Sequence, residues 1–162
     1  MPDSVEDKVR RVALGADHGG LEAKNTLATY LGSLGYEVTD VGTYTPDSVD
    51  YPDFALKVAR AVAGGRCDRG IMVDGAGIGS SMVCNKVRGI RAALCYDLKT
   101  VLNSREHNNA NVLTLGGPRH KPDELCEMAR VWLTTRFAGG RHWPRINKMM
   151  AVERTGGGYG AE

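Results

Sequence analysis

Short apolar runs alternate with amphipathic segments five times along the chain, and this alternation restricts the fold more than any other feature. Strands are predicted at residues 12–16, 36–41, 70–73, 90–95 and 111–115, where apolar and β-branched residues cluster. Helices are predicted at residues 21–34, 54–62, 98–106, 123–137 and 141–154. A further helix is predicted from a cap at Ser80 or Ser81 to about residue 87. Such alternation is typical of a parallel sheet with helices on both faces.

The length and composition predict one globular domain, over residues 1–155, with a flexible glycine-rich tail at 156–162. Apolar stretches are far shorter than the roughly 20 residues of a membrane helix, and the first residues are acidic rather than a targeting signal. We therefore expect a cytoplasmic protein that does not bind membranes. Aromatic residues make up only 6%, which argues against a nucleic-acid partner. The four cysteines lack metal-ligand spacing, so we expect reduced thiols and no metal.

A glycine-rich loop at residues 74–79 follows the third predicted strand. Its amides could converge on an anion at a helix N-terminus, although a tight turn alone would also need glycines. A dinucleotide site is the specific rival, because Gly75 and Gly77 precede Asp97 at the next strand end. Ser80 stands where that motif needs glycine or alanine, and the loop follows the wrong strand, so an NAD-dependent oxidoreductase is a minor alternative.

Three further polar groups are candidates for chemistry. Asp17 and His18 follow the first strand, where ligands bind in parallel sheets. His107 follows a helix and could act as a general acid or base, or could simply cap the helix end. Arg141 and Arg145, four residues apart on one predicted helix face, suit a phosphate clamp, and a solvated basic face is the alternative.

Taken in order, these segments resemble the type B ribose-5-phosphate isomerase family, which includes galactose-6-phosphate isomerase subunits. The resemblance spans about residues 12–153 and rests on residues 15–20, 50–52, 75–79, 85–86, 89–92, 104–108, 111–113 and 139–145. It implies a Rossmann-like three-layer α/β/α sandwich with a five-stranded parallel sheet. It also implies a homodimer or homotetramer with active sites shared between subunits. The implied reaction is aldose–ketose isomerisation of a small sugar phosphate through a cis-enediolate, without metal or cofactor.

The resemblance also implies roles for individual residues. Asp17 and His18 would line the sugar site, and His107 would help to open the furanose ring. Asn108 would contact the sugar. Arg141 and Arg145 would hold the phosphate together with His18. The two arginines would reach across the subunit boundary from the C-terminal helix 141–154, which would pack on a partner subunit. The anion hole for the enediolate would be formed by Gly75, Ala76, Gly77, Gly79 and the adjoining Ser80.

The chain departs from the family pattern where the carbon base is expected. Asp74 replaces the usual cysteine, and Ser80 replaces the alternative glutamate. Ala76 lacks a hydroxyl often found in the loop, and Pro118 displaces an expected arginine to Arg119. We interpret Asp74 as the base, since burial would strengthen a carboxylate as a base. The alternative is a non-catalytic sugar-phosphate-binding relative. Ribose 5-phosphate is the leading substrate; tetrose 4-phosphates and hexose 6-phosphates stay open.

Overall fold

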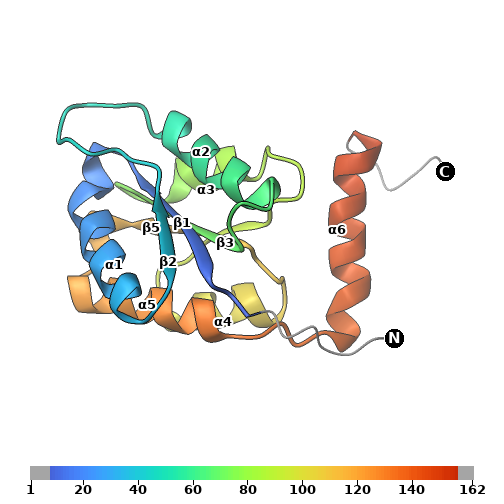
Figure 1. The fold of residues 1–162 in the computed structure, drawn as a ribbon. Coiled ribbons are helices and arrows are strands. Elements are labelled where there is room, and N and C mark those ends of the chain that lie inside the picture. The colour runs from blue at the N-terminus through green and yellow to red at the C-terminus, as the bar shows by residue number, and fades with distance from the viewer. Residues whose placement is uncertain (1–7, 157–162) are drawn as a thin grey trace.

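A computed structural model describes residues 8–156, and its centre is a five-stranded parallel sheet in the order β2-β1-β3-β5-β4 (Figure 1). The predicted number and direction of the strands are therefore confirmed. Both edge strands, β2 and β4, are short, whereas the three central strands are almost completely buried. The strands are β1 Arg11–Ala16, β2 Glu37–Asp40, β3 Arg69–Asp74, β4 Ala92–Leu94 and β5 Val112–Gly116.

Helices cover both faces of the sheet, as the alternation predicts (Figure 1). One face is covered by α2 and α3, and the other by α1, α4 and α5. A sixth helix, α6, stands apart from this sandwich. The helices are α1 Leu21–Ser33, α2 Tyr51–Ala63, α3 Ile78–Cys84, α4 Leu98–Glu106, α5 Pro122–Thr134 and α6 Trp143–Thr155.

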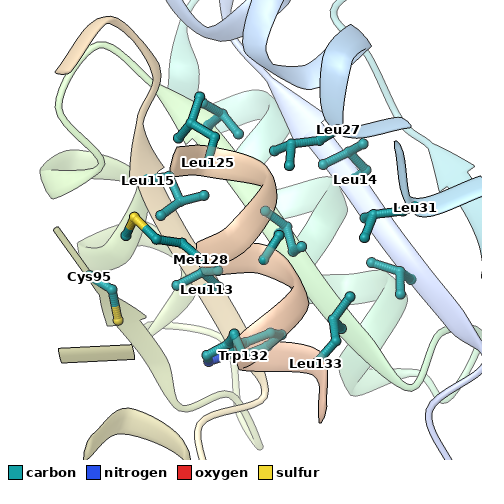
Figure 2. Close-up of a cluster of buried hydrophobic side chains, with 14 of the residues drawn as sticks. Leu14, Leu27, Leu31, Cys95, Leu113, Leu115, Leu125, Met128, Trp132 and Leu133 are labelled. Carbon is teal, nitrogen blue, oxygen red and sulfur yellow. The ribbon is translucent and has the colours of Figure 1, made fainter. Parts of the chain in front are cut away.

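The larger core lies between the sheet and the α1–α5 layer, and Figure 2 shows its side chains. Leu14 and Leu113 extend from the strands toward Leu31 of α1 and Trp132 of α5. Alternate strand residues point to opposite faces, so Ala13 of β1 enters the second core beneath α2. Each fully buried leucine contributes roughly 1.5–3 kcal/mol. The sheet that carries the candidate residues is therefore a rigid platform.

Several predicted helix boundaries are wrong. Helix α3 begins at Ile78 rather than at a serine cap, and it ends at Cys84 rather than at residue 87. Helix α5 ends at Thr134 rather than at 137, and α6 begins at Trp143 rather than at 141. Residues 140–142 form a separate 3-10 turn because Gly139 and Gly140 both adopt positive φ angles.

Helix α6 lies along the edge of the sheet where the strands begin (Figure 1). Two contacts near its C-terminal end attach it to the segment before β4. Glu153 accepts a hydrogen bond from the Gly89 amide at 3.0 Å, and Met150 Sδ accepts one from Arg91 at 3.5 Å. A groove of about 1300 Å³ remains between α6, β4 and α4.

Among residues 8–156, no helix is long and apolar enough to span a bilayer. The predicted tail falls almost entirely outside the described residues, because only Gly156, which caps α6, is included.

Candidate active site

The glycine loop after β3 closes around the Asp74 carboxylate. Asp74 is only 4% exposed, and its Oδ1 accepts hydrogen bonds from the amides of Ala76, at 2.9 Å, and Gly77. Its Oδ2 accepts from the Ser80 amide at 3.3 Å and from the Ser80 hydroxyl. Gly77 is the N-cap of α3 and Ser80 lies in its first turn, so the Asp74 carboxylate accepts from the N-terminus of this helix and the predicted serine cap is wrong. The loop amides do converge on an anion, and that anion is the chain's own carboxylate.

The shape of this loop depends on two of its glycines. Gly77 has φ +76°, and a Cβ there would lie 2.9 Å from the backbone carbon of Leu115. A Cβ on Gly79 would lie 2.4 Å from Tyr51 Cζ. Neither position can take a side chain without displacing β5 or the Tyr51 ring. The glycines therefore allow the loop to pack closely between β5 and α2.

Asp17 and His18 lie beside this loop, at the end of β1. An ideal Cβ on Gly19 would lie 3.6 Å from the Gly75 nitrogen, so the turns after β1 and β3 are in contact. Asp17 is buried and accepts from the Gly20 amide at 3.1 Å. Burial raises the pKa of its carboxyl, and the nearby Asp74 charge raises that pKa further. The exposed His18 accepts the Val49 N–H at Nδ1, at 3.2 Å, so a neutral His18 carries its proton on Nε2.

The raised pKa of Asp17 predicts a gain in stability when its charge is removed. The native protein binds this proton more tightly than the unfolded chain, so stability falls as pH rises from 3.8 through the raised pKa. Asp17→Asn is expected to be more stable than the natural chain toward urea at neutral pH. That difference should disappear near pH 3, below both pKa values. The exposed Asp47→Asn serves as the control, and an equal gain there would contradict the assignment to burial.

The remaining predicted residues lie at the opposite edge of the sheet. Helix α4 runs back from the end of β4 to the start of β5, which places His107 and Asn108 where the strands begin. Arg141 lies in the 3-10 turn nearby, and Arg145 lies in α6; both are exposed. The prediction that these two arginines share one helix face is wrong, because Arg141 precedes the helix.

The chain therefore divides its candidate residues into two groups. The carboxyl-edge group is Asp17, His18, Asp74, Gly75, Ala76, Gly77, Gly79 and Ser80. The amino-edge group is His107, Asn108, Arg141 and Arg145. A six-residue strand such as β3 is roughly 20 Å long, and the two groups lie at its opposite ends. One small sugar phosphate cannot contact both groups of the same chain.

Sequence reasoning missed two residues of the amino-edge group. The Nδ2 of Asn103 lies 2.9 Å from His107 Nδ1, and the His142 ring stacks on His107 with centroids 4.3 Å apart. The four-residue spacing between Asn103 and His107 on one helix could have indicated the first contact. The stack joins distant segments, and no sequence pattern indicates it.

The structure also places three further residues. Asp97, the candidate ribose-binding acid, is the N-cap of α4, and its side chain accepts from the Thr100 amide at 2.7 Å. Arg119 is exposed in a 3-10 turn after β5, at the carboxyl edge. Cys84 donates from Sγ to the Ala55 carbonyl at 3.4 Å, and burial raises the pKa of its thiol to about 12. Within the described range, His, Cys, Asp and Glu do not cluster as metal ligands do.

Comparison with known proteins places this geometry in a family. A family model described as Ribose/Galactose Isomerase matches residues 12–149, which include the residues of both groups. The chain belongs to the ribose/galactose isomerase family. A solved ribose-5-phosphate isomerase B from Clostridium thermocellum is 47% identical, with a TM-score of 0.88, over 90% of this chain and 98% of that one. The resemblance and the α/β/α fold inferred from the sequence are thereby confirmed.

Two curated relatives are equally similar to this chain, but their names give different substrates. Ribose-5-phosphate isomerase B of Escherichia coli is 40% identical over 90% of this chain and 98% of its own length. D-erythrulose-4-phosphate isomerase of Pectobacterium atrosepticum is also 40% identical, over 85% of this chain and 91% of its own. The chain is therefore a sugar-phosphate isomerase that interconverts aldoses and ketoses.

Proposed function

We propose that the chain interconverts ribose 5-phosphate and ribulose 5-phosphate through a cis-enediolate, with Asp74 as the carbon base. The observation that carries this proposal is the convergence of the Ala76 and Gly77 amides on one oxygen of the buried Asp74 carboxylate. Isomerisation needs these two components: a base for the carbon-bound proton, and donors for the oxygen that becomes negative.

In the proposed mechanism, the substrate exchanges places with the Asp74 carboxylate. When the carboxylate turns from the loop toward the sugar, the Ala76 and Gly77 amides become available to the substrate oxygen O1. Asp74 then takes the proton from C2, the electron pair of that bond forms the C1=C2 double bond, and O1 becomes the oxyanion. Return of the proton to C1 gives the ketose. The hydrogen moves as a proton within one molecule, so no redox cofactor is consumed.

Asp17 is proposed to carry the second proton that the reaction must move. Conversion of an aldose to a ketose transfers a proton from the hydroxyl at O2 to O1, in addition to the carbon-bound proton. A carboxyl group with a raised pKa can both give and take such a proton. Asp17 lies next to the Asp74 loop and has this property, whereas His18 offers its Nε2–H to the substrate phosphate.

Two copies of the chain are proposed to build each site, in a homodimer or homotetramer. The carboxyl-edge group of one copy would meet the amino-edge group of another, which brings His107, Asn108, Arg141 and Arg145 to the sugar and its phosphate. Helix α6 would pack on the partner. Its exposed Met149 and Val152, which line the groove beside β4, support this arrangement.

A tetrose 4-phosphate is the second candidate substrate, because the erythrulose-4-phosphate isomerase is as similar to this chain as the pentose enzyme is. Incubation with ribose 5-phosphate in D₂O, followed by NMR, tests the proposal. We expect ribulose 5-phosphate with deuterium at C1, because a proton held by Asp74 exchanges with solvent before it returns. Absence of turnover with the pentose, but turnover of erythrose 4-phosphate, would assign the tetrose. Inactivity toward both would overturn the proposal.

A further inference from the structure

Two residues at the amino edge of the sheet, Asn103 and His142, hold the His107 side chain from two sides. His107 follows the last residue of α4, and its backbone N–H still bonds the Asn103 carbonyl at 3.0 Å, so its ring starts from a fixed backbone position. Asn103 contacts one ring nitrogen, and His142 covers one ring face. A surface histidine at a helix end does not require two such partners.

Asn103 determines which nitrogen of His107 carries the proton. The Nδ2 of Asn108 donates to the Asn103 side-chain oxygen at 3.1 Å, which fixes the direction of the Asn103 amide. The Asn103 NH₂ group therefore faces His107 Nδ1 at 2.9 Å, and an NH₂ group can only donate. The neutral His107 ring must accept at Nδ1, so its proton lies on Nε2. The same amide thus orients both His107 and Asn108.

His142 fixes the plane of the His107 ring. The two rings stack at 4.3 Å between centroids with only 15° between their planes. His142 is 7% exposed, and its segment is anchored because the Ala138 amide donates to the Glu106 carbonyl at 3.0 Å, beside His107. Phe137 further restrains this segment through an edge contact with Trp143.

The charges around the stack favour the neutral form of His142. Burial lowers the pKa of His142, and His107, Arg141 and Arg145 lower it further by repulsion. These are the groups that face His142 from α4, the 3-10 turn and α6. A neutral His142 ring can lie face to face with the His107 ring without charge repulsion.

We infer that Asn103 and His142 are positioning residues that present His107 Nε2 to the substrate for opening of its furanose ring. This inference rests on the proposed function, because only a cyclic sugar phosphate needs the step. Ring opening breaks the bond between C1 and the ring oxygen O4, and it moves the proton of the C1 hydroxyl to O4. A group that assists this transfer must have one nitrogen in a defined place and a defined protonation state.

The sharpest variant is Asn103→Asp, because it is isosteric and still accepts from Asn108 but cannot donate to His107. We expect ¹⁵N NMR of the neutral imidazole to show the proton on Nε2 in the natural chain and on Nδ1 in this variant. Conversion of ribose 5-phosphate should fall roughly 10- to 100-fold. Deuterium exchange at C1 of ribulose 5-phosphate should stay within about twofold, because this ketose has no free hydroxyl that can close a furanose ring, so its exchange needs only the base.

The His142 variants test the stack separately. His142→Ala should show the same selective loss with ribose 5-phosphate, and His142→Phe, which keeps an aromatic face, should restore most of it. Equal losses in both assays, an unchanged tautomer, or no loss at all would overturn the inference. Inactivity of the natural chain in both assays would instead overturn the proposed function and, with it, the catalytic role of Asn103 and His142. The tautomer measurement would still decide the geometry.

Discussion

Substitution of Asp74 by asparagine is expected to lower kcat for ribose 5-phosphate by about 10³-fold and to leave sugar-phosphate binding nearly unchanged. The reason is that an amide cannot take a proton from carbon, although it has almost the shape of the carboxylate. Its oxygen can still accept from the Ala76 and Gly77 amides, and its NH₂ can donate to the Ser80 hydroxyl oxygen. Only the long bond from the Ser80 amide, at 3.3 Å, is lost. The loop should therefore keep its structure while the base is lost.

Steady-state kinetics with ribose 5-phosphate, together with calorimetric binding of a phosphorylated aldonic acid, would measure both effects. Ser80→Ala is the matched control, since it removes one hydrogen bond to Asp74 and leaves the carboxylate in place. We expect its kcat to change by less than about 10-fold. Near-normal turnover of Asp74→Asn would show that Asp74 only caps α3 and that the base lies elsewhere.

Two inactive variants are expected to restore activity when their subunits are mixed. Asp74→Asn disables the carboxyl-edge group, and His107→Asn disables the amino-edge group of the same chain. If each site takes one group from each of two copies, a mixed dimer carries both defects in one site and an intact pair in the other. Random exchange of equal amounts would recover about a quarter of the natural activity, because half of the dimers are mixed.

The mixing experiment can be done by joint refolding from urea, with each variant refolded alone as the control. Mixing the double variant Asp74→Asn/His107→Asn with the natural chain should give the opposite result. Each site of a mixed dimer then carries one defect, so only the natural dimers, about a quarter of the total, should convert ribose 5-phosphate. Recovery no greater than the sum of the separate variants would contradict sites shared between subunits. It would require one chain to bring its two groups together, which the length of β3 opposes.

Most of the fold follows from local patterns in the sequence. The five strands are short, apolar and separated by amphipathic segments, and parallel strands buried on both faces need this pattern. The boundaries that differ depend on contacts distant in sequence. The end of α5 is one example, because the Thr135 carbonyl accepts from Arg105 in α4 and leaves the helical path.

The candidate site was predictable in its residue types but not in its arrangement. The glycine loop, Asp17 and His18 follow strands, and the ends of neighbouring parallel strands lie together. The direction of α4, by contrast, carries His107 to the other edge, and no spacing in the sequence reports that separation. The direction of the Asp74 side chain was equally hidden, because it depends on the positive φ angle of Gly77 and on the place of Ser80 in the first turn of α3.

The burial of Cys84 has a consequence for the conditions that the chain can tolerate. A thiol with a pKa of about 12 stays protonated at neutral pH, and peroxides and alkylating agents react with thiolates. Burial also raises the pKa of Cys95. With the Asp74 carboxylate in place of a thiol at the end of β3, the proposed chemistry uses no thiolate that these reagents could attack. Oxidative stress would then leave its catalytic centre intact.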